Sequence, residues 1–295
     1  MKDRFSRLHP AVNFCYFALV IGFSLAVQHP ICQAVSLVCA GLYARKLTGS
    51  PGFWLLVKLS LPLALFTAVL NPLFNHRGLT PLFSLPWGGF VTLESLLYGL
   101  SAGAMLFGIM LWFACFNEAL PTDRFLYLFG GLMPGLSLVL SMSIGFIPRF
   151  IGQYRAVSDA QKGLGRDMTR GSWVQRGKNA AAVLSVTLSW ALENAADTAD
   201  SMKSRGYGGK RSRYALYPFT ALDGCLLAAV LLAGGALIAG AFAGCFRFDY
   251  FPALGWKAPG VFECFCFAAQ AALCALPLLY DLWEERKWNS LHSKI

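Results

Sequence analysis

Residues 53–74 read FWLLVKLSLPLALFTAVLNPLF and carry a single charged side chain, Lys58. A helix needs about 20 mostly apolar residues to cross the hydrocarbon core of a bilayer. Lys58 lies close to the start of the stretch, where a long side chain can extend to the membrane interface. The stretch therefore predicts a membrane-spanning helix.

The rest of the chain has the same character. Of its 295 residues, 56% are hydrophobic and 14% are charged, whereas a soluble domain carries about 25% charged residues. Other apolar segments occupy residues 11–27, 30–43, 91–116, 125–147, 218–243 and 261–280. We therefore predict an all-α, polytopic helical membrane protein.

Most of the positive charge lies in one block. The net charge is +10, and residues 148–213 hold twelve Lys and Arg against five Asp and Glu. Basic segments between membrane helices face the cytoplasm. We predict N-terminal membrane helices over 1–147, a cytoplasmic helical region over 148–213, and C-terminal membrane helices with a polar tail over 214–295. Residues 180–203 lack Gly and Pro and predict one long helix in the middle region.

The count of apolar segments conflicts with that orientation. Five of them precede the basic block, and five crossings from a cytoplasmic N-terminus would place the block outside. One segment must therefore fail to cross. The short segment 30–43 and its neighbour are the first candidates. A basic loop is expected over 44–52, and the remaining residues, about 14 in number, are too few to span the membrane.

The glycine-rich, basic stretch 200–212 does not form a nucleotide-binding loop. The phosphate-binding pattern needs Gly, four residues, Gly-Lys and then Ser or Thr, between a strand and a helix. With Gly209 and Lys210 aligned to that pattern, Ser204 stands at the first glycine and Arg211 at the hydroxyl position. The stretch also follows a helix. We predict that the chain is not an ATPase.

Two interpretations of Ser204-Arg205-Gly206 follow from the residues alone. Gly206 can end a helix in the left-handed conformation, with Arg205 as a favourable cation at the helix C-terminus. Alternatively, Arg205 projects from the helix tip and binds a carboxylate of a cytoplasmic partner through two parallel hydrogen bonds. The nine cysteines form no CxxC pair and the four histidines are scattered. We therefore expect no metal site, and cysteines that act as small buried apolar residues.

Several phrases of the sequence resemble one family. Residues 199–208, ADSMKSRGYG, are similar to the second Ala-Arg-Gly signature of the transmembrane coupling component of energy-coupling-factor (ECF) transporters. Residues 145–167, GFIPRFIGQYRAVSDAQKGLGRD, resemble the phrase around the first signature. There the triplet reads Gly163-Leu164-Gly165, so the arginine is missing. Two interpretations are left open. Either Arg166 or Lys162 replaces the arginine, or the contact made by the first signature is weaker in this chain.

The resemblance implies a function and partners. The chain would be the coupling subunit of an importer for a vitamin or for cobalt or nickel ions, in the inner or plasma membrane of a prokaryote. Its cytoplasmic tips, Gly163 to Arg166 and Ser204 to Gly206, would sit in grooves of two ATP-binding-cassette (ABC) ATPase subunits. Its membrane helices would hold a small substrate-binding membrane subunit. ATP would be bound by the partners, and this chain would bind no cofactor, no metal and no nucleic acid.

Two other classes of protein are weighed against this one. An intramembrane enzyme needs polar side chains that converge within the bilayer, and the candidates Lys58, Glu94, Asp223 and Glu263 lie mostly near segment ends. A stand-alone secondary transporter is expected to show an internal repeat with interrupted helices, and we find none in the sequence.

Overall fold

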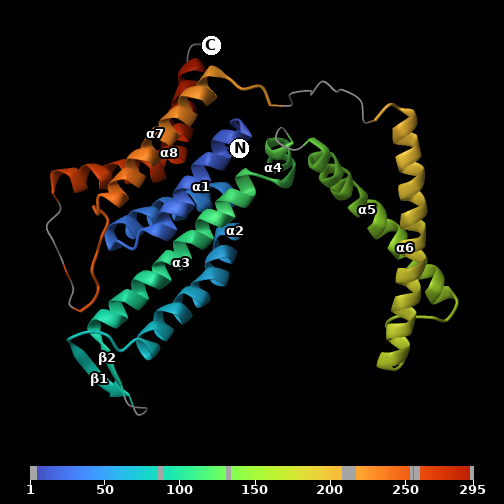
Figure 1. Ribbon diagram of the computed structural model, residues 1–295, viewed down its shortest axis with the longest axis horizontal. Helices are drawn as coiled ribbons and strands as arrows, with labels where there is room; N and C mark the ends of the chain where they lie inside the picture. Colours follow the sequence, from blue (N-terminus) through green and yellow to red (C-terminus); the bar gives the residue numbers. More distant parts are fainter. Residues whose placement is uncertain are drawn as a thin grey trace. The chain divides into compact units, whose positions relative to one another are not determined.

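The computed structural model describes residues 5–85, 89–130, 134–207, 217–252, 255 and 260–292. The chain forms two compact units (Figure 1). Unit 1 comprises Met1–Phe125 and Tyr217–Ile295, and unit 2 comprises Leu126–Leu216. The predicted boundary at 147/148 falls inside a continuous helix, and the one at 213/214 lies outside the described residues.

Unit 1 is helical apart from one hairpin. Its elements are listed in chain order: the 3-10 turn η1 (Phe5–Arg7), α1 (Pro10–Ala26), α2 (Pro30–Phe74), β1 (Pro81–Leu85), β2 (Gly89–Thr92), α3 (Leu93–Ala119), α7 (Ala221–Phe242) and α8 (Val261–His292). The helix α4 (Thr122–Phe129) starts in unit 1 and ends in unit 2. Within the described residues, four helices are long and apolar enough to cross a membrane: α2, α3, α7 and α8. The all-helical, polytopic prediction is confirmed, and the β-hairpin within the predicted connection 71–89 is an addition to it.

The helix α2 is a hairpin of two antiparallel arms. Gly49 interrupts it with φ 72° and ψ 175°. Ser101 of α3 donates to Gln33 across 2.6 Å, while a Cβ added at Gly103 would lie 2.6 Å from the carbonyl oxygen of Ala64. A straight helix would hold residues 33 and 64 about 45 Å apart. The arms 30–48 and 50–74 therefore fold back on each other, and the predicted loop over 44–52 is wrong, because one left-handed glycine makes the reversal.

One end of unit 1, here called the junction end, gathers the N-terminus and both connections to unit 2. The guanidinium of Arg124 donates to the carbonyl oxygen of Ser6, and the His9 backbone N–H donates to Asp223 across 3.1 Å. Lys46, near the end of the first arm of α2, pairs with Asp281 of α8 at 3.1 Å. The first ends of α1 and α7 and the last parts of α3 and α8 are thus brought together.

The opposite end, here called the hairpin end, carries β1 and β2. The Tyr250 hydroxyl lies 2.9 Å from the carbonyl oxygen of Gln28 and 2.8 Å from the Ser101 hydroxyl. The ring of Tyr250 also packs edge-on against Tyr98, 5.3 Å away. Six helical segments therefore run between the two ends: α1, the two arms of α2, α3, α7 and α8.

The five apolar segments that precede the basic block are divided between the two units. Four of them, 11–27, 30–43, 53–74 and 91–116, belong to unit 1. The suspected segment 30–43 forms the first arm of α2 and reaches from one end of unit 1 to the other. The segment 125–147 is instead divided between α4, which ends at Phe129, and α5, which starts at Pro134, and almost all of it belongs to unit 2.

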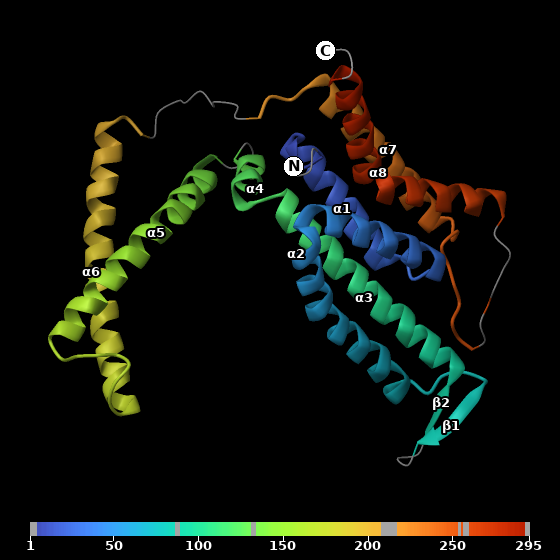
Figure 2. The same cartoon turned by 180° about the vertical axis from the view of Figure 1, so that it is seen from behind.

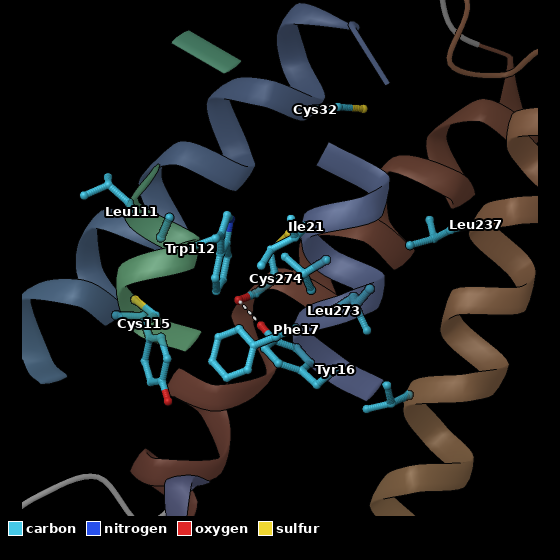
Figure 3. Close-up of a cluster of buried hydrophobic side chains, with 14 of the residues drawn as sticks. Tyr16, Phe17, Ile21, Cys32, Leu111, Trp112, Cys115, Leu237, Leu273 and Cys274 are labelled. Atoms are coloured by element: carbon cyan, nitrogen blue, oxygen red, sulfur yellow. Dashed lines mark hydrogen bonds between the residues drawn. The ribbon is translucent and has the colours of Figure 1, made fainter. Parts of the chain in front are cut away.

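An aromatic cluster holds unit 1 together (Figure 3). Trp112 of α3 and Tyr16 and Phe17 of α1 are fully buried, with ring centroids 5.2–6.3 Å apart. The Trp112 ring N–H donates to Ser36 at 2.9 Å, and the Tyr16 hydroxyl donates to the carbonyl oxygen of Cys274 at 3.4 Å. Each polar edge therefore has a partner, as buried Trp and Tyr need.

The cysteines only partly follow the prediction. Five of them are buried: Cys32, Cys115, Cys245, Cys266 and Cys274. Cys225 and Cys264 are exposed, so for these two the expectation is wrong, because each lies on an uncovered face of an apolar helix. The described residues contain no group of three or more His, Cys, Asp or Glu that could hold a metal ion.

Unit 2 is a crossed pair of long helices, α5 (Pro134–Gly163) and α6 (Trp173–Ser204) (Figure 1; Figure 2). The ring of Phe150 packs against Trp190, and beyond the end of α5 the carbonyl oxygen of Asp167 accepts from Asn179 of α6. Residue numbers rise along α5 and fall along the part of α6 that faces it, so the two helices run antiparallel. The predicted helix 180–203 is confirmed, and it begins seven residues earlier, passing through Gly177.

Candidate coupling tips

The predicted site residues lie at the C-terminal ends of α5 and α6. Gly163 is the last residue of α5, and Leu164, Gly165 and Arg166 follow it. Ser204 is the last residue of α6, and Arg205 is its C-cap. We call residues 161–166 tip 1 and residues 202–207 tip 2. The glycine-rich, basic residues 208–216, including Gly208 of the signature, lie outside the described residues.

Tip 2 is closed by two backbone hydrogen bonds, one nested inside the other. The Tyr207 N–H donates to the carbonyl oxygen of Met202 at 3.0 Å, and the Gly206 N–H donates to that of Lys203 at 3.0 Å. Gly206 has φ +76°, in the left-handed region. This is the Schellman arrangement, which satisfies carbonyl groups that a helix end otherwise leaves without partners.

Tip 1 repeats the same arrangement. The Arg166 N–H donates to the carbonyl oxygen of Gln161 at 2.9 Å, and the Gly165 N–H donates to that of Lys162 at 3.0 Å. Gly165 has φ +77°. The two tips therefore present the same backbone, although their side chains differ.

The side chains at tip 2 leave the guanidinium available. Arg205 is exposed, and no hydrogen bond or ion pair to its side chain is found among the described residues. The Ser204 hydroxyl donates back to the carbonyl oxygen of Ser201 at 2.9 Å. Arg205 thus extends from a rigid helix end as a planar donor that suits a carboxylate.

A network around Asp167 fixes the loop that follows tip 1. The carboxylate of Asp167 accepts from the Thr169 N–H at 2.9 Å and from the Thr169 hydroxyl at 2.8 Å. The backbone hydrogen bond from Thr169, and then that from its hydroxyl, lowers the pKa of Asp167 below its ordinary value of 3.8. Asn179 of α6 donates to the Asp167 carbonyl oxygen at 2.9 Å, and Arg176 donates to that of Met168 at 3.0 Å. These contacts account for the early start of α6, which sequence reasoning missed.

The structure does not bring the two tips together. Tip 1 lies beside Asn179, because Asp167 contacts that side chain. Arg205 is 26 residues further along the same helix, which at 1.5 Å per residue is about 40 Å. The crossed helices therefore present two equivalent backbone caps at well-separated points of one rigid unit.

The junction end of unit 1 holds a second set of polar contacts, and it was not predicted from the sequence. Arg124 lies over the ring of Tyr217, 5.8 Å from its centroid, as well as bonding to Ser6. Asp223 accepts from the backbone and hydroxyl of Thr220 at 3.0 and 2.6 Å, and from His9. The chain segments that lead into and out of unit 2 are thus fastened to each other and to the N-terminus. Only the Thr220–Asp223 spacing, a capping box, could have signalled part of it.

The acidic residues weighed for an intramembrane enzyme lie in the first turns of three helices and accept hydrogen bonds there. Glu94 accepts from the Thr80 hydroxyl at 2.8 Å at the start of α3, and Glu263 accepts from the Gly260 N–H at 3.0 Å at the start of α8. Asp223 caps α7. Asp223 lies at the junction end and Glu94 at the hairpin end, so these carboxylates do not converge on one site.

Comparisons with known proteins point to one family. The model of the CbiQ family, described as cobalt transport protein, matches residues 3–215. A Listeria innocua protein named energy-coupling factor transporter transmembrane protein EcfT is 36% identical over 104 residues, which is 35% of this chain and 39% of that protein. A protein of the same name from Lactobacillus helveticus is 30% identical over 105 residues, 35% of this chain and 38% of its own length. The matched part thus spans about two fifths of these curated relatives.

Proposed function

Because the chain belongs to the CbiQ family of cobalt transport proteins, we propose that it is the transmembrane coupling subunit of an ECF-type importer. In this proposal, two ABC ATPase subunits bind tips 1 and 2, and a separate small membrane subunit recognises the substrate, a vitamin or a cobalt or nickel ion. ATP is bound by the ATPase subunits, and this chain transmits their motion.

The observation that carries the proposal is the presentation of Arg205. A 32-residue helix ends in a rigid cap that leaves this guanidinium exposed and without a partner in the described chain. An unpaired cation in such a position contributes little to the stability of the chain itself. It is well suited to a charge-assisted contact with an acidic groove of another protein.

The charge distribution supports an orientation in the membrane. Basic residues at the junction end of unit 1 include Arg7, Arg45, Lys46 and Arg124, whereas the described residues at the hairpin end include Arg77 and Arg247. By the positive-inside rule, this distribution supports a junction end that faces the cytoplasm of a prokaryotic cell. Both connections to unit 2 leave from that end, which supports the proposal that the tips act on the cytoplasmic side, where ATP is available.

The proposal is tested by replacing Arg205. The chain is co-expressed with the ABC ATPase subunits of its own organism, purified in lipid nanodiscs, and its bound ATPase is quantified. Arg205→Ala should weaken ATPase association by about 1.5–3 kcal/mol, the range for a hydrogen bond to a charged group. Arg166→Ala is the matched control and should have a smaller effect. Normal assembly and normal ATP-driven uptake in the Arg205→Ala complex would refute the proposal.

A further inference from the structure

The shared cap geometry aligns the two tips residue by residue. In both, the residue with positive φ is the glycine that follows the C-cap, so the register is fixed by the backbone and not by sequence similarity. The aligned pairs, tip 1 before tip 2, are Gln161 and Met202, Lys162 and Lys203, Gly163 and Ser204, Leu164 and Arg205, Gly165 and Gly206, and Arg166 and Tyr207.

This register argues against both basic residues that could replace the missing arginine. Lys162 corresponds to Lys203, which tip 2 has in addition to Arg205, and its ammonium lies 3.2 Å from Asp159 of its own helix. Arg166 corresponds to Tyr207 and follows the left-handed glycine, where the chain has already turned away from the helix axis. Neither occupies the C-cap position.

Leu164 is the residue at that position, and 73% of its surface is exposed. A groove built to hold Arg205 would keep an acidic group for the guanidinium, and a leucine in the same place would leave that carboxylate buried and unpaired, which is costly. A groove that accommodates Leu164 is therefore expected to be apolar where a groove for Arg205 is acidic.

We propose that Leu164 is the anchor of tip 1 and inserts into an apolar pocket of one ABC ATPase subunit. The proposal rests on the proposed function, because it needs the ATPase subunits as partners. It makes Leu164 and Arg205 a pair of specificity determinants: each tip selects a chemically different groove, so the two ATPase surfaces cannot exchange places without loss of affinity.

The test compares single variants of the full chain in nanodiscs with the ATPase subunits that co-purify with the wild type. Each variant is titrated with the purified subunits, and the number bound and their Kd are measured. Leu164→Ala should weaken binding at one of two sites by about tenfold or more, because a buried leucine side chain is lost. Leu164→Asp should abolish that site, and Leu164→Met should retain it. Lys162→Ala and Arg166→Ala should each weaken that site less than Leu164→Ala does, since surface charges contribute little.

The outcomes separate this inference from the proposed function. If the wild-type chain binds no ATPase, the proposed function fails. If it binds ATPase at two sites, and Leu164→Asp leaves both intact or Arg166→Ala removes one, the assignment of Leu164 is overturned while the coupling function stands. Because Leu164 is exposed, its replacement does not disturb a core, and an unchanged circular dichroism spectrum confirms that α5 and α6 remain folded.

Discussion

Phe150 of α5 and Trp190 of α6 meet edge to face, with ring centroids 5.9 Å apart and planes at 87°. This pair lies at the crossing of the two helices, whereas the tips lie well beyond it. Arg205 is 15 residues past Trp190, or about 22 Å along α6. A change of crossing angle is therefore magnified at the tips, and the aromatic pair helps to fix that angle.

We expect Trp190→Ala to loosen the crossing. The lost ring pair is worth about 0.5–1.5 kcal/mol beyond the area that it buries. With nitroxide labels at residues 159 and 201, pulsed electron–electron double resonance should give a broader distance distribution in the variant than in the wild type. Leu192→Ala is the control, because Leu192 is on the same helix with 65% of its surface exposed. Equal widths for Trp190→Ala and wild type would show that the ring pair does not set the angle.

The glycines at tip 1 allow a matched test of the cap. Gly165 has φ +77° and open space around its Cβ position, and Gly163 has the same open space within the helix. Gly165→Ala should destabilise the cap by about 1 kcal/mol through backbone strain alone, while Gly163→Ala should stabilise α5 by about 0.5–1 kcal/mol. Hydrogen exchange at the Gly165 and Arg166 amides measures both. Faster exchange in both variants would contradict the conformational explanation.

The junction end should depend on Asp223, which joins α7 to the N-terminus. Asp223→Ala removes the acceptor for Thr220 and for the His9 N–H. We expect a loss of about 1–3 kcal/mol, the range for a buried hydrogen-bonding group left without its partner. Thermal unfolding in nanodiscs measures the loss. Asp197→Ala, at an exposed position on α6, is the control, and a comparable decrease in that variant would mean that the effect is not specific to the junction.

The sequence was sufficient to predict those features that depend on neighbouring residues along the chain. Apolar windows predicted α3, α7 and α8, and the Arg-Gly phrase placed tip 2 at a helix end. It was insufficient where long-range contacts decide. Basic, glycine-containing residues 44–52 have the composition of a loop, yet the reversal needs only Gly49 in the left-handed region. The contact between His9 and Asp223 joins residues 214 positions apart, and no periodicity signals it.

The segment 125–147 illustrates the same limit. Its apolar composition alone predicts a crossing, but it is divided between α4 and α5 and packs into unit 2. The arrangement of tip 1 was also beyond composition. The triplet Gly163-Leu164-Gly165 left open which residue takes the role of the arginine, and the hydrogen bonds of the two caps show that Leu164, and not Arg166, occupies the position of Arg205.

The loop after tip 1 should respond to acid through Asp167. Hydrogen bonds from Thr169 lower the pKa of this carboxyl in the folded protein, so its ionised form stabilises the loop. That stabilisation is fully present above the unfolded pKa of about 3.8–3.9 and is lost as the pH falls through the lower folded value. The Thr169 amide should therefore keep the same protection from hydrogen exchange between pH 7 and pH 5, after correction for the intrinsic rate.

Asp167→Asn should reproduce the acid state at neutral pH and expose this amide. Asp159→Asn, which removes only the exposed pair with Lys162, should leave the amide protected. Protection that is unchanged in Asp167→Asn would mean that Asn179 and Arg176 hold the loop without the carboxylate.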